Sequence, residues 1–343
     1  MKTLPSLNQL VKSQMKNILS LACFPSTQIA SQSLRLLLCL VIFGYSFQCM
    51  GQIDSIYLTA NWSVGDAYDF QVTKTTLSQG RPGRTTPDTQ TYLAHFKVID
   101  STDAGYIIRW RTGRDLDRLG LNEKQLEDMA DLRWTDVIYS TTPSGEFRHI
   151  ENWQAVRYET KRFFTKLAKM TPGADQVDES NIQRIVAPRM RGYQSRESME
   201  KGIFRELTVF HAPFGTTYVM GDPQIVNDTP MELMPGRTMQ ADIYVYLDSI
   251  DVSTGLCSIR QEMTVDGDDL RENVLGSKNS KKLRAEAKKA LTRSEMTLKD
   301  RNLFQHYFRS GTPKRIEASR EVGVTVDRRK TVTTLEVLIE LIE

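Results

Sequence analysis

The chain has 343 residues, of which 40% are hydrophobic, 25% charged and 8% aromatic. This is a globular composition, and it excludes a disordered, collagen-like or disulfide-scaffold chain. The net charge of +3 is too small for a dedicated nucleic-acid binder, and the mean hydropathy of -0.40 excludes a polytopic membrane protein.

The amino terminus has the pattern of a secretory signal peptide. No Asp or Glu precedes Asp54, and the four basic residues of this region come before an apolar run that starts at Leu36. The run has about 12 residues, whereas a membrane-spanning helix needs about 20. Small side chains near Cys49 and Gly51 suit a signal peptidase. We therefore predict a signal peptide over residues 1–51 and cleavage that leaves Gln52 as the first residue.

Three alternatives to this leader stay open. The run could remain as an uncleaved anchor, and Met15 could be the real start, with residues 1–14 untranslated. Acylation of Cys49 would make a lipoprotein. The residues just before Cys49, 45–48, lack the aliphatic and small side chains that such a site needs.

Export would change the charge and the cysteine count of the protein. The leader holds four of the 45 basic residues, so 41 basic residues would remain against 42 acidic ones, a net charge of −1. Only Cys257 would remain of the four cysteines. A mature chain of about 290 residues without an internal disulfide needs a sizeable core, in one large or two small domains.

Short runs of alternating apolar and polar residues predict strands in both end regions of the mature chain. Turn sequences such as Ser101 to Gly105 and Thr142 to Gly145 separate several of them and indicate hairpins. The predicted strands cover residues 67–74, 91–100, 106–111, 137–140, 147–150, 241–247, 257–265, 303–309, 315–322 and 331–342.

Helical periodicity dominates the middle of the chain. Trp153, Val156, Phe163, Leu167 and Met170 fall on one stripe, and we expect Asn152 to cap this helix. A second helical segment around 182–186 meets Pro188, which should stop or kink it. A third runs from Met199 through Phe210, a small helix follows Asn122, and a basic helix spans about 280–292.

Two parts of the sequence resemble each other. Residues 96–109 align with 247–260, and residues 144–151 align with 310–317. Coincidence is the alternative, because turn chemistry repeats in any β protein. We predict an α+β protein, an antiparallel sheet or half-barrel from two related halves with a central helical insertion. Its parts would be a first β-rich half at 52–152, the helical insertion at 153–215 and a second β-rich half at 216–343.

Motifs of the common enzyme classes are missing from the sequence. We find no phosphate loop, nucleophile elbow, zinc-binding helix with paired histidines or dinucleotide fingerprint. We therefore predict no catalytic residues, no metal site and no cofactor, and leave the ligand-binding residues unknown. Three of the four histidines fall on predicted strands and one falls at a helix end, and we interpret them as surface or half-buried residues: His95, His149, His211 and His306.

Cys257 and an acidic cluster are two further candidates for chemistry. Cys257 lies in an alternating apolar row, so we interpret it as a buried structural residue, with catalysis or intermolecular pairing as alternatives. Asp266, Asp268, Asp269 and Glu272 could bind calcium. We favour a turn followed by an acidic first helical turn, which the helix dipole stabilises.

The stretch 278–301 holds nine basic residues and only a modest apolar stripe. A solvated helix face is the simplest interpretation. The alternative is peripheral contact of this basic helix with anionic lipid or with lipopolysaccharide phosphates.

Several segments carry a resemblance: the leader that ends at Gly51 with Gln52 next, residues 62–70 (Trp-Ser-Val-Gly-Asp-Ala-Tyr-Asp-Phe), and Ser144-Gly145-Glu146-Phe147 before Asn152-Trp153. On these segments, about a fifth of the chain, the sequence resembles uncharacterised exported β-rich proteins of Gram-negative bacteria. The resemblance implies export to the periplasm or the cell surface. It supplies no catalytic residues to carry over, because such families have none assigned. A looser analogy at fold level is to the half-barrels of periplasmic lipoprotein carriers.

Our leading functional hypothesis is a non-enzymatic cell-envelope protein that binds an apolar or amphipathic ligand, or an envelope protein, between sheet and helices. The alternatives are a structural or protein-interaction module with no small ligand, and a hydrolase with an unrecognised site. A curved sheet opposite the helical side chains could leave a pocket, or the same side chains could fill a solid core: Phe163, Phe164, Leu167, Met170, Met199, Ile203 and Phe210.

Overall fold

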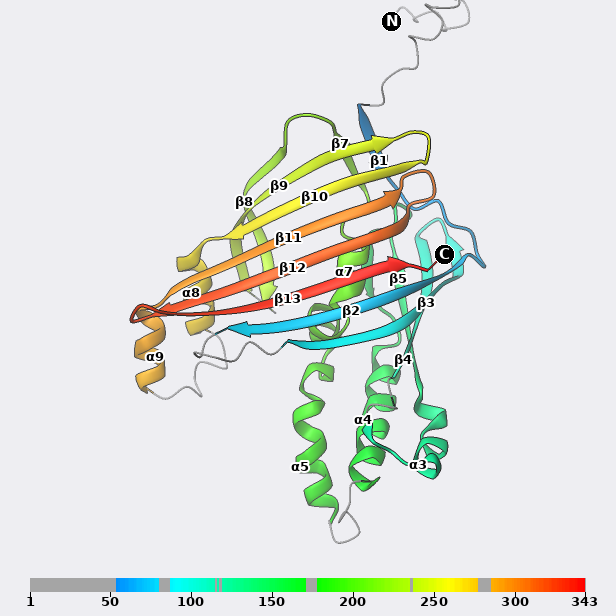
Figure 1. The fold of residues 1–343 in the computed structure, drawn as a ribbon, viewed down its shortest axis with the longest axis vertical. Coiled ribbons are helices and arrows are strands. Elements are labelled where there is room, and N and C mark those ends of the chain that lie inside the picture. Colours follow the sequence, from blue (N-terminus) through cyan, green and yellow to red (C-terminus); the bar gives the residue numbers. More distant parts are fainter. Residues whose placement is uncertain are drawn as a thin grey trace, which may run out of the picture. The chain divides into compact units, whose positions relative to one another are not determined.

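An eleven-stranded antiparallel sheet forms the framework of the protein in its computed structural model (Figure 1). The chain divides into two units, Met1–Gln52 and Ile53–Glu343, and every residue that the structure describes belongs to the second. The predicted signal peptide, 1–51, therefore lies outside the described residues. Those residues are 54–79, 87–114, 116, 119–170, 178–234, 237–276 and 285–342.

The order of strands in the sheet is β6-β5-β4-β3-β2-β13-β12-β11-β10-β9-β8. The first five strands run outward from the centre, and the remaining six begin at the opposite edge and run back to pair β13 with β2. Within the described residues the sheet is open, with β6 and β8 at its edges. The predicted α+β class with an antiparallel sheet is confirmed. The strands are β2 (Ala67–Gln79), β3 (Asp88–Thr102), β4 (Gly105–Gly113), β5 (Trp134–Thr141), β6 (Phe147–Ile150), β8 (Gln224–Met234), β9 (Arg237–Asp251), β10 (Leu256–Val265), β11 (Glu295–Tyr307), β12 (Thr312–Val326) and β13 (Arg329–Leu341).

A two-stranded ribbon accompanies this sheet. β1 (Ser55–Leu58) pairs with β7 (Thr216–Val219), and an isolated bridge between Met220 and Leu247 links the ribbon to β9. Three strands, β1, β7 and β8, lie outside the strand ranges predicted from the sequence. β1 and β7 are only four residues long, so they offer little alternation to detect.

The helices form two groups. Helices α4 and α5 extend away from the sheet beside α3 (Figure 1). Helix α8 packs against β9 and β11, and α9 packs against α8. Helix α7 packs against β12, β13 and β6. The helical elements are α3 (Glu123–Asp128), η2 (Ala130–Leu132), α4 (Trp153–Met170), α5 (Glu179–Arg189), η4 (Arg191–Tyr193), α6 (Arg196–Ser198), the π-helical turn η5 (Met199–Ile203), α7 (Arg205–His211), α8 (Gly267–Gly276) and α9 (Ala285–Thr292).

The main core lies between α7 and the face of the sheet that we call the inner face. Alternate strand residues supply it, because successive side chains of a strand point to opposite faces. The Phe210 ring of α7 lies with its centroid 5.3 Å from Phe70, 5.7 Å from Phe96 and 5.6 Å from Trp110. The alternation that predicted strands at 91–100 and 106–111 corresponds to a buried row on each strand: Ala94, Phe96 and Val98, and Ile108 and Trp110.

The two matched turns of the internal repeat hold the same piece of chain between them. Ala60 N donates to Ser144 O at 2.8 Å, and Asn61 N donates to Ser310 O at 3.1 Å. The glycine that follows each serine has a positive φ, 102° in Gly145 and 75° in Gly311. A Cβ on Gly145 would lie 2.9 Å from the Phe214 ring, and one on Gly311 would lie 3.0 Å from it. Both turns therefore require glycine, for conformation and for space.

The matched segments also occupy equivalent places along the chain. One helical connection, with α3, joins β4 to β5, and another, with α8 and α9, joins β10 to β11. Both sets of hairpins lie at the same end of the sheet, as the strand registers require. This arrangement fits two related halves, although the halves at 52–152 and 216–343 stay a prediction.

One helical prediction needs correction, because the predicted third helix is broken into α6, η5 and α7, with a π-helical turn at Met199–Ile203. The second helix stops near Pro188 as predicted, since α5 ends at Arg189. The basic helix predicted at about 280–292, within the stretch 278–301, ends at Thr292 in α9 as expected. The strand predicted at 303–309 begins earlier, at Glu295 in β11, because Met296 and Leu298 are buried at alternate positions of a strand.

Candidate functional site

The inner face of the sheet changes from apolar to polar partway along its strands. Lys74 follows the buried Phe70 and Val72 in the same inward phase of β2. On β12, Arg320 follows Ile316 and Ala318 in the same way. Polar side chains at these inward-facing positions need polar partners from the helical segments that cover the inner face of the sheet.

Glu206 of α7 supplies the partner on the β2 side. Its carboxylate is 1% exposed, with Oε2 2.6 Å from Lys74 Nζ, and Oε1 accepts a hydrogen bond from Tyr92 Oη at 2.9 Å. Lys74 Nζ also donates to Ile203 O at 3.0 Å. Burial raises the pKa of Tyr92, and the Glu206 charge raises it further. The carboxylate is therefore paired with a charge through Oε2 and hydrogen-bonded through Oε1.

Arg205, the neighbour of Glu206, points to the other side of the same layer. Arg320 binds Asp300 through two hydrogen bonds of 2.7 Å and 2.5 Å, and Arg205 Nη2 lies 3.9 Å from Asp300 Oδ2. Burial lowers the pKa of Arg205 to about 10, and the Arg320 charge lowers it further. The first turn of α7 thus contacts two parts of the sheet, with the Glu206 carboxylate on β2 and the Arg205 guanidinium near Asp300 of β11.

A cavity of about 640 Å³ opens beside this charged layer, between strands β2 to β5 and the helical segments α4, η5 and α7. Its sheet side is polar, with Lys74, Tyr92, Thr112 and Thr135. Its helical side is largely apolar, with aromatic and aliphatic side chains that include Phe163, Phe164, Ile203 and Phe204. A polar floor under apolar walls is the arrangement that receives an amphipathic molecule.

Arg114 joins the lining of the cavity directly after β4. Its Nη1 donates to Leu132 O, and its guanidinium carbon lies 4.6 Å from the centroid of the Phe163 ring. Burial lowers the pKa of this guanidinium, although it remains charged at neutral pH. Nothing in the sequence singled Arg114 out, because it lies in a connection with no motif.

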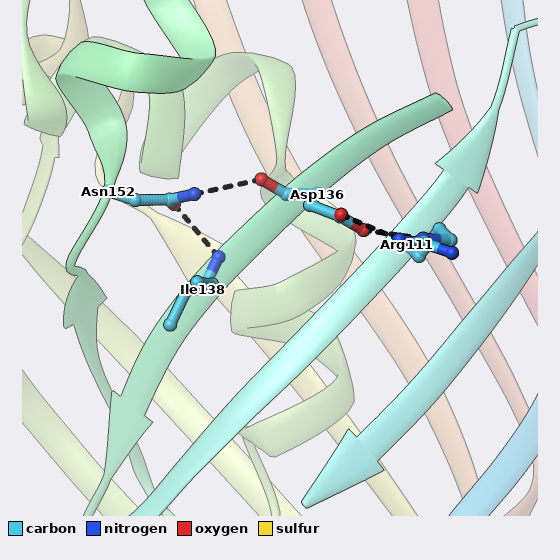
Figure 2. A network of polar contacts seen from close by, with 4 residues as sticks. All are labelled: Arg111, Asp136, Ile138 and Asn152. Carbon is cyan, nitrogen blue, oxygen red and sulfur yellow. Dashed lines mark hydrogen bonds and ion pairs between the residues drawn. The ribbon is translucent and has the colours of Figure 1, made fainter. Parts of the chain in front are cut away.

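Asn152 places the start of α4 against the sheet (Figure 2). Its Oδ1 accepts a hydrogen bond from Ile138 N at 2.8 Å, and its Nδ2 donates to Asp136 O at 2.9 Å. The side-chain amide thereby continues the pairing of β5 beyond the short strand β6. The prediction that the Asn152 side chain caps α4 is wrong, because β5 takes both of its polar atoms. On the other side of Asp136, Arg111 binds the carboxylate at 2.7 Å and 2.9 Å.

We expect Asn152→Ala to destabilise the protein by about 1–3 kcal/mol, because it leaves two backbone groups of β5 without partners. Hydrogen exchange at the Ile138 amide should accelerate. Arg111→Met is the matched control, since it removes a half-exposed ion pair and should cost about 0–1 kcal/mol. Equal losses from the two variants, measured by denaturant unfolding, would contradict this role of Asn152.

The side chains predicted to line a pocket divide into three groups. Phe163, Phe164 and Ile203 line the cavity. Met199 and Phe210 belong to the main core. Leu167 and Met170 pack in a smaller cluster with Met129 and Leu132. Part of this set therefore lines a pocket and part fills a solid core, so each of the two interpretations holds for some of these side chains.

Two of the four histidines contradict the prediction that they are surface or half-buried residues. His211 is 2% exposed and His306 is fully buried, whereas His95 and His149 are half-exposed and lie beside Asp69 and Glu151. His211 Nδ1 lies 2.6 Å from Gly145 O and Nε2 lies 2.9 Å from Tyr139 Oη. Neither ring nitrogen of His306 has a hydrogen-bond partner among the described residues. Sequence alternation could have found His306, which shares the inward phase of Phe304.

The remaining sequence candidates have structural roles in the described part of the chain. Cys257 is 1% exposed, which confirms its predicted burial, and burial raises its pKa to about 11. Asp266 Oδ1 accepts hydrogen bonds from the backbone of Asp268 and Asp269, both at 2.9 Å, as the helix-start interpretation predicted. Within the basic stretch, Lys288 and Lys289 are exposed on α9, and membrane contact there stays a prediction.

A second depression, of about 480 Å³, lies over β2 and β10 to β13. Four of its six charged side chains are paired: Arg260 binds Glu262 at 3.1 Å, and Arg315 binds Glu317 at 2.7 Å. The other two, Arg301 and Glu336, carry opposite charges, so the lining has no excess of unpaired charge of one sign. Among the described residues, no group of three or more His, Cys, Asp or Glu side chains is placed to hold a metal ion. In the same part of the chain no helix has the length and apolar character to cross a membrane.

Comparisons with known proteins find only distant similarity. No protein-family model matches the sequence, and no curated protein matches it. Among solved structures, the chain is similar to lipovitellin, in a structure concerned with lipid–protein interactions, at 8% identity and a TM-score of 0.38, covering 82% of this chain and 26% of that one. It thus spans about a quarter of the lipovitellin chain.

Two bacterial structures show weaker similarity. An exported protein with a YmcC-like fold from Bacteroides fragilis has 10% identity and a TM-score of 0.21, covering 83% of this chain and 97% of that one. Ail, the attachment invasion locus protein of Yersinia pestis, has 8% identity and a TM-score of 0.14, covering 81% and 99%. At these scores the similarities carry no argument about function. The functional proposal below is therefore based on the cavity.

Proposed function

We propose that this is an exported cell-envelope protein that binds an amphipathic small molecule between the inner face of its sheet and helices α4 and α7. The main support for this proposal is the cavity of about 640 Å³ with a polar floor and apolar walls. Its volume falls within the range of roughly 300–1,000 Å³ that ligand pockets occupy. The leader pattern of residues 1–51 supports export, to the periplasm or the cell surface of a Gram-negative bacterium.

Binding is favoured over hydrolysis by the positions of the titratable groups. A hydrolytic site needs a perturbed acid or base in an accessible cleft. Among the described residues, the strongly perturbed histidines His211 and His306 are buried in the core instead. Of the two carboxylates that line the cavity, Glu206 forms an ion pair with Lys74 and Asp88 is exposed to solvent.

Native mass spectrometry of the protein, purified gently from its own envelope, tests the proposal. We expect a retained mass of lipid size that is lost on denaturation. A stoichiometric protein in its place would contradict the proposal and favour an interaction module. Absence of both, together with no binding of the neutral fluorophore N-phenyl-1-naphthylamine, would also contradict it.

We expect Gly202→Phe to abolish binding of that fluorophore without lowering the thermal midpoint. Gly202 lines the cavity, and a Cβ added there would meet no atom within 4 Å. The new ring would occupy the cavity, while replacing a helical glycine should not destabilise the fold, because phenylalanine is the better helix former of the two. Fluorescence titration and thermal unfolding measure the two effects. Ala187→Phe, at an exposed position of α5 outside the cavity, is the control and should bind normally.

A further inference from the structure

We propose that the ligand of this cavity is a single-chain amphiphile with a carboxylate head group, and that Arg114 binds the carboxylate. This inference rests on the proposed function and adds the chemical class of the ligand. It follows from the donors and acceptors around the cavity, from its charges and from the position of its aromatic wall.

The polar groups of the cavity have spare donors. A guanidinium carries five N–H donors, and Arg114 uses one of them, on Leu132 O, among the described residues. Lys74 donates to Ile203 O and forms an ion pair with Glu206. Both oxygens of Glu206 are in contact with Lys74 or Tyr92, although Oε2 accepts no hydrogen bond. The spare donors of Arg114 therefore call for a ligand that brings acceptors to this part of the lining.

The charges of the lining point the same way. Lys74 and Glu206 neutralise each other at 2.6 Å. Asp88, the other carboxylate of the lining, is exposed to solvent at the start of β3. Arg114 is then a cation without a carboxylate within ion-pair distance in the described part of the chain. The Glu159 charge acts on it from farther away and raises its pKa, against burial, which is the larger cause and lowers it. Desolvation of this cation is offset most fully by an anion that hydrogen-bonds to it.

The surroundings of Arg114 orient such a ligand. The Phe163 ring lies 4.6 Å from the guanidinium, so one side of the cation is already covered by the apolar wall. Tyr193 is near enough for the Arg114 charge to lower its pKa, against burial, which is the larger cause and raises it. A carboxylate beside Arg114 and Tyr193 would let an attached alkyl chain run along Phe164 and Ile203, which line the same cavity.

Calorimetric titration of the purified protein with laurate, dodecanol, dodecylamine and acetate tests the inference. Laurate and dodecanol share a chain, so their difference isolates the head group. We expect laurate to bind about 10- to 100-fold more tightly than dodecanol, as a charge-assisted hydrogen bond predicts. Dodecylamine should bind more weakly than either, and acetate should not compete, because the chain supplies most of the affinity.

Arg114→Gln should bring the affinities for laurate and dodecanol close together, and Arg114→Lys should restore part of the preference. Arg133→Gln, which removes a charge from an exposed neighbouring position, should leave the preference unchanged. Equal binding of laurate and dodecanol to the wild type would overturn the inference while leaving the proposed function intact. So would tightest binding of dodecylamine, competition by acetate, or an unchanged preference in Arg114→Gln. Failure of all three chain compounds to bind would instead contradict the proposed function.

Discussion

Acidification from pH 7 to pH 5 should destabilise the folded protein by about 4 kcal/mol, because two buried histidines stay neutral in the folded state. Burial lowers the pKa of His211 to about 3, and burial together with the nearby His211 lowers the pKa of His306 to about 3. In the unfolded chain both pKa values return to about 6.5.

The sign of this effect follows from proton binding. Between pH 6.5 and pH 3 the unfolded chain binds protons that the folded protein does not, so stability falls as the pH falls through that window. Each histidine contributes about 2 kcal/mol by pH 5, and the slope approaches about 2.7 kcal/mol per pH unit for the pair. Denaturant unfolding at pH 7, 6 and 5 measures it.

Substitution of one histidine should halve the effect. His306→Leu removes one titrating group and also two ring nitrogens that have no partner among the described residues, so we expect it to be neutral or stabilising at pH 7. The loss on acidification should then shrink to about 2 kcal/mol. His149→Gln, at a half-exposed position, is the control and should keep the full loss. Equal stability of the wild type at pH 7 and pH 5 would refute the assignment of neutral buried histidines.

Removal of the Glu206 carboxylate should have the second largest effect. Glu206→Leu leaves the ammonium group of Lys74 and the hydroxyl of Tyr92 without their acceptor at a buried position. Loss of one partner of a buried ion pair costs about 3–5 kcal/mol, and we expect about 3 kcal/mol here because Lys74 is 27% exposed. Denaturant unfolding at pH 7 measures the loss.

A double variant distinguishes an unpaired charge from lost packing. Lys74→Met combined with Glu206→Leu removes both charges, and we expect it to recover at least half of the lost stability. Asp131→Ala is the surface control, because Arg162 and Asp131 are 47% and 52% exposed and their pair should contribute about 1 kcal/mol or less. If the double variant were as unstable as Glu206→Leu, the loss would arise from packing around α7.

Much of the sheet could be predicted from the sequence because its signals are local. Alternation over 91–100 and 106–111 identified β3 and β4, and the turn residues between them fixed the hairpin. Strand order was beyond reach, since the pairing of β2 with β13 joins residues far apart in the chain. The broken third helix was also beyond reach, because the spacing of Met199, Ile203 and Leu207 fits a regular helix.

The cavity is harder to predict than the fold for the same reason. Lys74 and Glu206 are 132 positions apart, and neither belongs to a motif. The sequence does contain a local signal, which is a polar residue at a position where the alternation predicts a buried apolar one. Lys74 continues the apolar row of Phe70 and Val72, and Glu206 lies one helical turn before Phe210, on the buried side of its helix. Alternation shows that such residues are buried, but only the tertiary structure shows which partners they meet.

The capture of Ala60 and Asn61 between the turns at Ser144 and Ser310 has a consequence for biosynthesis. The early segment cannot be locked in place until residues near 310 have left the ribosome, and β2 exposes an unpaired edge until β13 follows. Folding of the sheet is thus a late event of high contact order, which makes it slow. Until then, the growing polypeptide carries an open edge that can pair with other chains, so aggregation competes with maturation.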